Sequence, residues 1–338
     1  MTTDYTANFA GTSCFSPKVS IIIPVYNEAL RIRACLESLE KQVYPSDRFE
    51  ILIVDNNSTD KTDQIAGEYA HVSVLYERKM QSPYAARNTA IIQSTADIVA
   101  FIDADCVASQ EWLSQLVEPF KDSRIAGVGG KITSYQATNA VERFIQNHLS
   151  YEHCDKENGR FLTGLITANA AYRREDVIEV GLFNTMFDGS DIDLSWRIQM
   201  RTGKNVVIIP NATVYHAHRA SENRLFWWEY RMGFGAVLMS TIYKHVNDAY
   251  YNPKFQRALV LKEIGAITIY IASICYRSIR NLFHSMPPDA DYLEKPRLFL
   301  IAESGSLWGR LAGIINTGNF RKDIQLTKWE EPRKGHKN

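Results

Sequence analysis

The chain has 338 residues, of which 45% are hydrophobic and 22% charged, and its formal net charge is zero. This length suits one large domain or two smaller ones, and the neutral charge argues against nucleic acid as a partner. The five cysteines are dispersed without zinc-site spacing, which favours a reducing, cytoplasmic compartment. No charge-free apolar run of about 18 residues occurs, so we expect no membrane-spanning helix.

Strand and helix patterns alternate through the first hundred residues. Continuous β-branched and apolar runs predict buried strands at residues 19–23, 49–54, 72–76 and 98–102. Helical spacing of apolar residues predicts helices at 28–41, 61–69 and 82–94. Short connections between such elements indicate a parallel α/β sheet with helices on both faces.

Beyond residue 105 the pattern becomes mixed and finally helical. We expect strands within 125–134, 165–172 and 206–215, and helices at 111–121, from 174, and at 191–201. Further helices are expected at 224–245, 254–284 and about 298–316. The predicted organisation is a mobile leader (1–17), an α/β domain (18–220), a helical region (221–327) and a charged, disordered tail (328–338).

Three polar clusters follow predicted strands, at 24–28, 55–60 and 103–105. Each cluster alone fits an ordinary helix cap or turn. Together they fall on one edge of the sheet, where ligands bind in open α/β folds. Asp103 and Asp105 are spaced so that both carboxylates can reach one hard cation, which substrate phosphates usually share.

The motifs together resemble the family 2 glycosyltransferases of GT-A fold. The matching segments are VSIIIPVYNE at 19–28, VDNNSTD at 54–60, AARN at 85–88 and DAD at 103–105. The resemblance runs from residue 19 to about 218. It implies a Rossmann-like, mixed and mainly parallel sheet flanked by helices, with a helical C-terminal appendage. It also implies an inverting sugar transfer from a nucleoside-diphosphate sugar.

The resemblance assigns roles along the sheet edge. Asp105 would ligate a divalent cation, Mg²⁺ or Mn²⁺, and Asp103 would hold the ribose or reach the cation through water. The donor nucleotide would contact Pro24, Tyr26, Glu28, Asp55, which hydrogen-bonds the base, and Arg87, which borders the diphosphate. The family commonly has Asp and Gly where this chain has Asn56 and Asn57, which leaves the base open.

A further acidic cluster at 187–197 opens a predicted helix. Family members typically have Glu-Asp here, with the Asp as general base; this chain keeps Asp191 and has Ser190 in place of the Glu. A carboxylate at a helix N-terminus is held ionised by the helix dipole, as a base requires. The alternative is that Ser190 or Asp191 only caps the helix.

The remaining site predictions concern the acceptor and a third metal ligand. By the same resemblance, Asn169, Ser190 and Trp196 would lie on the acceptor side. His216 and His218 leave the last strand two residues apart, and one of them would be a further metal ligand. The alternative is that both are loop histidines that contact phosphate or solvent.

The helices after residue 221 are rich in aromatic and basic residues, including Trp227, Trp228 and Arg231. Aromatic residues at helical spacing usually form a core, so these helices would pack on the catalytic domain or on another subunit of a homo-oligomer. The alternative is a peripheral surface on the cytoplasmic face of the membrane, which suits a lipid-linked acceptor.

The predicted reaction moves a sugar to a glycan or lipid-linked saccharide in surface polysaccharide biosynthesis. A nucleotidyltransferase on a related sheet would need a Gly-rich phosphate loop with a basic residue after the first strand, and residues 24–28 have neither. A non-catalytic sugar-nucleotide-binding module would lack Asp105 or Asp191, and both are present.

Overall fold

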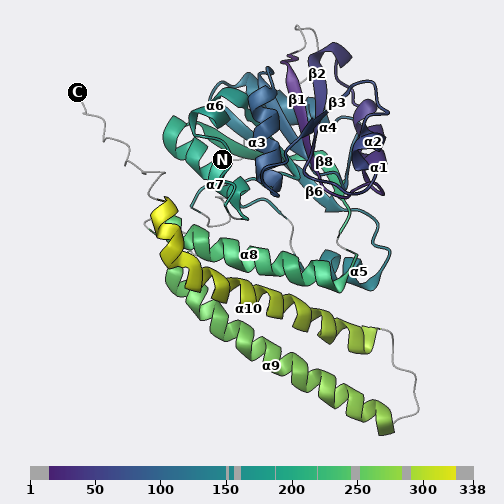
Figure 1. The fold of residues 1–338 in the computed structure, drawn as a ribbon, viewed down its shortest axis with the longest axis vertical. Helices are drawn as coiled ribbons and strands as arrows, with labels where there is room; N and C mark the ends of the chain where they lie inside the picture. Colours follow the sequence, from purple (N-terminus) through teal and green to yellow (C-terminus); the bar gives the residue numbers. More distant parts are fainter. Residues whose placement is uncertain are drawn as a thin grey trace, which may run out of the picture.

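A computed structural model describes residues 15–149, 152–155, 161–186, 188–218, 220–244, 252–283 and 291–324. Most of the predicted leader and the whole predicted tail, 328–338, lie outside these residues. The described chain forms an α/β domain, and long C-terminal helices lie side by side against one side of it (Figure 1).

One eight-stranded sheet has the order β3-β2-β1-β4-β7-β6-β8-β5. The first four strands of this order are parallel, whereas β7 runs antiparallel to both β4 and β6. The predicted GT-A class, a mixed sheet with flanking helices, is therefore confirmed. The strands are β1 (Val19–Val25), β2 (Phe49–Asp55), β3 (Val72–Tyr76), β4 (Ile98–Ile102), β5 (Cys106–Ala108), β6 (Ile125–Ser134), β7 (Asn169–Arg173) and β8 (Asn205–His216).

Helices cover the sheet and continue beyond it. They are α1 (Ile32–Glu40), α2 (Thr62–Ala66), α3 (Pro83–Gln93), α4 (Trp112–Val117), α5 (Ala140–His148), α6 (Arg174–Glu179), α7 (Ser190–Thr202), α8 (Glu222–Ile242), α9 (Pro253–Phe283) and α10 (Asp291–Ile324). The pattern missed α5 and the three-residue β5. Asn139 accepts a hydrogen bond from the Glu142 backbone and caps α5, and this Asn-x-x-Glu spacing was a usable signal.

Two apolar layers, one on each face of the sheet, hold the domain together. In β1, Ile21 and Ile23 pack with α1 and α4, whereas Ile22 packs on the opposite side with α3 and α7. Successive side chains of a strand point to opposite faces. Because both faces are covered, β1 reads as a continuous apolar run rather than an alternating one.

The C-terminal helices form layers. Trp196 of α7 packs against Met239 of α8, and Trp228 of α8 packs against α5. Farther out, α10 lies against α8, and α9 is the outermost helix (Figure 1). Helices at Pro253–Arg277 and Glu294–Asn316 are long and apolar enough to cross a membrane by length and composition. The expectation of no membrane-spanning helix rested on the stricter criterion of a charge-free run, and it stays a prediction.

Candidate active site

A cavity of about 700 Å³ opens at the carboxyl edge of the sheet. Its walls come from the ends of β1 and β4, the loops before α3 and α7, and one side of α8. The polar and aromatic lining includes Tyr26, Glu28, Asn56, Tyr84, Arg87, Asp103, Asp105, Asp188, Asp191, Trp228 and Arg231. Most predicted donor and catalytic residues therefore share one cavity.

Two left-handed asparagines shape the turns at this edge. The parallel register sets Val25 beside Asp55, so the turns after β1 and β2 are neighbours. Asn27 has φ 55° and Asn57 has φ 66°, conformations that asparagine tolerates better than most residues. Asn27 Oδ1 accepts a 2.8 Å hydrogen bond from the Thr59 backbone, which joins the two turns. The left-handed backbone explains why residue 57 is a position where the family has glycine.

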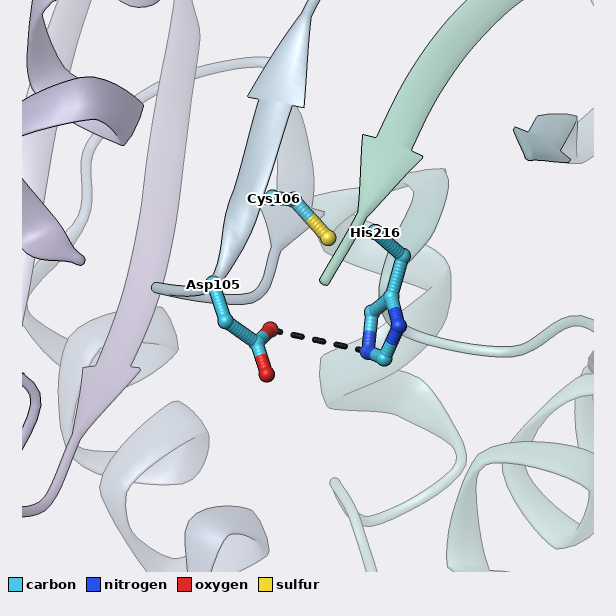
Figure 2. Close-up of side chains that lie close together, drawn as sticks. All are labelled: Asp105, Cys106 and His216. Atoms are coloured by element: carbon cyan, nitrogen blue, oxygen red, sulfur yellow. Dashed lines mark ion pairs between the residues drawn. The ribbon is translucent and has the colours of Figure 1, made fainter. Parts of the chain in front are cut away.

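Asp105 and His216 face one another from adjacent strand ends (Figure 2). Cys106 of β5 pairs with His216 of β8, which brings the imidazole Nε2 to 3.5 Å from Asp105 Oδ1. Ligand atoms of Asp105, Cys106 and His216 lie within 4.8 Å of one another. The thiol belongs to the fully buried core, whereas a carboxylate oxygen and an imidazole nitrogen suit Mn²⁺.

His218 has a different environment. Its Nε2 lies 2.7 Å from Ser134 Oγ, and its backbone carbonyl accepts a hydrogen bond from Arg31. Of the two histidines, His216 is the one that faces Asp105. The same Arg31 guanidinium lies 3.8 Å from the Asp105 carboxylate and 3.9 Å from that of Glu142. Neither Arg31 nor Glu142 was singled out from the sequence.

Carboxylates dominate this end of the cavity. Burial, followed by the neighbouring charge of Asp105, raises the pKa of Glu28 to about 7. Asp103 accepts a 2.7 Å charged hydrogen bond from Arg87, which is only 4% exposed. Acidic oxygens held this close together repel one another, and a divalent cation would relieve that repulsion. The donor set thus fits a hard or borderline cation.

Asp191 lies one residue inside the start of α7. The N-cap is Gly189, with φ 98°, and the Ser190 hydroxyl donates to the Asn184 carbonyl, so neither Ser190 nor Asp191 is the cap. Burial raises the pKa of Asp191 to about 6, although the charge of Arg87 opposes this shift. Desolvation opposes the helix dipole here and raises the pKa, yet a carboxyl with a pKa of about 6 is still mostly ionised at pH 7.

The raised pKa of Asp191 predicts a pH profile. If Asp191 is the base, its carboxylate must be ionised, so we expect kcat/KM to fall about tenfold per pH unit below pH ~6. Initial rates between pH 4.5 and 8 would show the break. A rate that stays constant down to pH 4.5 would contradict this assignment.

Three predicted acceptor-side residues do not line the cavity, and that expectation is corrected. Asn169 is fully buried; it accepts from Trp112 Nε1 and donates to the carbonyls of Lys131 and Ala212. Ser190 is fully buried, and Trp196, also buried, donates to the Leu162 carbonyl. Their hydrogen bonds hold the fold, and no polar atom remains directed at a ligand.

Asp55 is also set back from the cavity. It is 2% exposed, and both carboxylate oxygens lie 3.3 Å from the Ser58 backbone nitrogen. The neighbouring Asn56 lines the cavity instead, and its amide donates to the carbonyls of Glu77 and Met80. In this structure Asp55 therefore shapes the turn that presents Asn56.

One wall of the cavity is built by α8, which the sequence did not indicate. Trp228, Arg231 and Met232 line the cavity, and Arg231 Nε lies 3.4 Å from Asp188 Oδ2. The helix passes so close to the loop before α7 that a Cβ on Gly235 would overlap the Asp188 carbonyl oxygen. The Gly233-Phe234-Gly235 triplet was the available signal for this close approach.

The close contact between α8 and the loop before α7 predicts that Gly235→Ala disturbs this loop, which leads into Asp191. We expect it to destabilise the protein by about 1–3 kcal/mol, because a well-packed backbone contact must open. Gly265→Ala is the matched helical control: nothing lies within 4 Å of its Cβ, so it should stabilise by about 0.5–1 kcal/mol. Thermal unfolding of both variants is the measurement, and equal melting temperatures would contradict the coupling.

Comparison with known proteins shows which proteins this chain is similar to. The family model described as glycosyl transferase family 2 matches residues 20–181. Glycosyltransferase AglE of Haloferax volcanii is 39% identical over 186 residues, which are 52% of this chain and 59% of that protein. The pre-mycofactocin glycosyltransferase of Mycobacterium tuberculosis is 31% identical over 209 residues, 60% of this chain and 43% of that protein. The match therefore spans about half the length of these relatives.

A solved structure resembles a larger part of the chain. The mannosyltransferase PcManGT from Pyrobaculum calidifontis, in complex with GDP-Man and Mn²⁺, superposes with a TM-score of 0.59 at 18% identity. The likeness covers 90% of this chain and 88% of that one, so it extends into the C-terminal helices and supports the GT-A fold. Residues 20–181 thus match the glycosyl transferase family 2 model, and the solved structure agrees in fold.

Proposed function

We propose that the protein is an inverting glycosyltransferase that moves a sugar from a nucleoside-diphosphate sugar to a glycan or lipid-linked saccharide. The observation that carries this proposal is one cavity lined by Asp103, Asp105 and Arg87 together with Asp191. The first three groups are suited to binding a diphosphate and its cation, and Asp191 is suited to accepting a proton.

Asp191 would act as the base. The acceptor hydroxyl oxygen attacks the anomeric carbon and its proton passes to the Asp191 carboxylate. The bond from the anomeric carbon to the phosphate oxygen breaks, and its electron pair leaves with the nucleoside diphosphate. Attack opposite the leaving group inverts the anomeric configuration. With a pKa of about 6, Asp191 is ionised at pH 7 yet accepts a proton more readily than an ordinary aspartate.

Asp105 and His216 would hold the divalent cation, Mn²⁺ or Mg²⁺, with Asp103 beside them. A bound cation would neutralise the charge that gathers on the departing diphosphate. Arg87, fixed by Asp103, adds a positive charge that the chain itself supplies. Arg31, 3.8 Å from Asp105, orients that carboxylate.

The donor nucleoside would lie against Pro24, Tyr26 and Glu28. Tyr26 is 51% exposed, so its ring is available to stack on a base. GDP-Man and Mn²⁺ are bound by the Pyrobaculum mannosyltransferase, which supports a nucleotide sugar and a divalent cation here. A relative in Methanococcus voltae, 31% identical over 135 residues, is named for a dolichyl phosphate-linked substrate, which supports a lipid-linked acceptor.

The proposed arrangement keeps the predicted division of the chain. Residues 18–220 would form the catalytic domain, and 221–327 the helical region that completes the acceptor side. The reaction would take place in the cytoplasm, where the nucleotide sugar is available, as a step of surface polysaccharide biosynthesis.

Ligand screening tests the proposal. We expect a nucleoside diphosphate with Mn²⁺ or Mg²⁺ to raise the melting temperature by several degrees at saturating concentration. Release of that nucleoside diphosphate from its sugar donor, with polyprenyl-linked saccharides as acceptors, would then report turnover. Failure of UDP, GDP and dTDP to shift the melting temperature with either metal would overturn the donor assignment.

A further inference from the structure

The outer face of α9 is an exposed apolar stripe. Leu261, Ile264, Ile269, Ile271 and Tyr276 are all exposed, Leu261 by 73% and Ile269 by 67%. At about 100° per residue these five positions fall within an arc of about 160°, so they lie on one side of the helix. No Asp, Glu, Lys or Arg occurs from Ile264 to Tyr276. Soluble monomers rarely leave so continuous an apolar surface uncovered.

The burial of α9 is unlike that of a core helix. The segment Pro253–Arg277 is apolar enough to cross a membrane, yet only 6% of its most apolar window is buried. A core helix of a soluble protein with this composition would be mostly buried. At 1.5 Å per residue, these 25 residues extend over about 38 Å, which exceeds the apolar thickness of a bilayer.

Two polar residues of α9, Gln256 and Glu263, point inward, toward α10. Glu263 Oε1 accepts hydrogen bonds of 2.8 Å from both Arg310 Nε and Ser306 Oγ, and Gln256 accepts another from Arg310. All four side chains are buried. The helix pair thus buries a polar, hydrogen-bonded cluster while an apolar stripe of α9 remains exposed. Ionisable residues in membrane helices pair in this way, away from lipid.

The contact between α10 and α8 has a second feature of membrane helices. Gly305, Gly309 and Gly313 form a stripe at four-residue spacing. A Cβ on Gly305 would overlap the Phe226 carbonyl, and one on Gly309 would overlap that of Tyr230. Small residues at this spacing let helix backbones approach closely, and such stripes are enriched between membrane helices.

Basic residues flank the apolar stripe. Lys254 and Arg257 are exposed before it, Lys262 is exposed next to its first residue, and Arg277 follows it, whereas Glu263, the acidic residue of α9, is buried. This distribution complements anionic lipid headgroups. It disfavours a second copy of the chain as the covering partner. Both a parallel and an antiparallel pairing of α9 with itself would bring basic ends together.

We propose that the outer face of α9 lies in the apolar region of a lipid bilayer, with its flanking lysines and arginines at anionic headgroups. The α8 helix lines the cavity with Trp228 and Met232, packs on α10, and through it on α9 (Figure 1). The cavity would therefore be held at the membrane surface, where a lipid-linked acceptor is available. That consequence rests on the proposed reaction; lipid binding itself does not.

Liposome flotation of the full chain tests this proposal. We expect the protein to float with phosphatidylcholine–phosphatidylglycerol vesicles and to remain partly bound at high salt, because apolar burial is not screened. Ile269→Glu should weaken partitioning about 10- to 100-fold, since it removes one buried aliphatic side chain. Ile92→Glu on α3 is the matched control, because Ile92 is 62% exposed and lies outside the stripe; it should float like the parent.

Three further outcomes of these experiments bear on the lipid-binding proposal. Absence of flotation, or equal flotation of the Ile269→Glu and Ile92→Glu variants, would overturn the proposal. A lipid-free dimer that Ile269→Glu dissociates, without flotation of the parent, would show that a second copy covers α9. Nucleoside-diphosphate binding measured on the same samples separates this failure from failure of the proposed reaction.

Discussion

Replacing Asp191 with asparagine is expected to lower the rate of sugar transfer by about 10²- to 10⁴-fold, the usual contribution of a general base. Asparagine keeps the size of the side chain but cannot accept the proton of the acceptor hydroxyl. Binding of the donor should remain, because Asp105 and Arg87 are unchanged. Single-turnover transfer rates, together with titration calorimetry of the donor, would separate the two effects. An unchanged rate would refute the base assignment.

The same substitution should make the protein more stable at neutral pH. The folded pKa of Asp191 is about 6 against an ordinary 3.8, so the folded state binds this proton more tightly than the unfolded state. Ionisation above pH 6 therefore opposes folding, and Asp191→Asn should gain up to about 3 kcal/mol at pH 7. The gain should shrink as the pH falls through 6 and vanish below about pH 4.

Asp193 provides the matched control on the same helix. Its carboxylate accepts hydrogen bonds from Tyr243 at 2.7 Å and from Arg197 at 2.8 Å, and it is buried away from the cavity. Asp193→Asn should cost about 3 kcal/mol of stability, because it leaves Arg197 without its charged partner. The two variants should thus change stability in opposite directions. A fall in stability in both would mean that Asp191 also serves the fold.

Replacing Asp105 with alanine is expected to abolish the metal dependence of nucleotide binding. This change removes the carboxylate that faces His216 at 3.5 Å, and a single imidazole holds a hard cation weakly. Loss of charge stabilisation worth several kcal/mol should lower kcat/KM by about 10³-fold or more. Calorimetric titration of the nucleoside diphosphate with and without Mn²⁺ is the measurement.

Asp97→Ala controls for the loss of an aspartate near the same strand. Asp97 accepts a 2.9 Å hydrogen bond from the Lys18 backbone at the opposite end of β4. This variant should bind nucleotide with the same metal dependence as the parent. Metal-dependent binding that survives in Asp105→Ala would move the cation site away from Asp105 and His216.

Local patterns were sufficient for most of the α/β domain. Buried parallel strands must be apolar on both faces, and the turns after them must be polar. Residues 19–28 and 98–105 therefore predict both a strand and its end at the ligand-binding edge of the sheet. The DXD pair and Asp191 were found because they stand directly after strand or loop signals. The short β5 and the capped α5 carry too few residues for periodicity to register.

Roles that depend on side-chain orientation could not be predicted from the sequence. Asn169 and Trp196 fit the family pattern of an acceptor site, but their hydrogen bonds close within the core. The position of Asp191 at a helix start predicted that the dipole favours the ionised carboxylate, but it did not reveal that burial raises the pKa. Dipole effects follow from sequence position, but desolvation depends on what packs around the group.

By itself, then, the sequence determined most of the strands and helices, the polar edge of the sheet and the resemblance to family 2 glycosyltransferases. These features depend on residues near one another in the chain, where spacing and turn chemistry are sufficient. Only the tertiary structure selected His216 over His218 as the partner of Asp105, and set α8 against the cavity. It alone showed that α9 buries Glu263 against α10 and leaves its apolar stripe exposed, because orientation depends on contacts with distant helices.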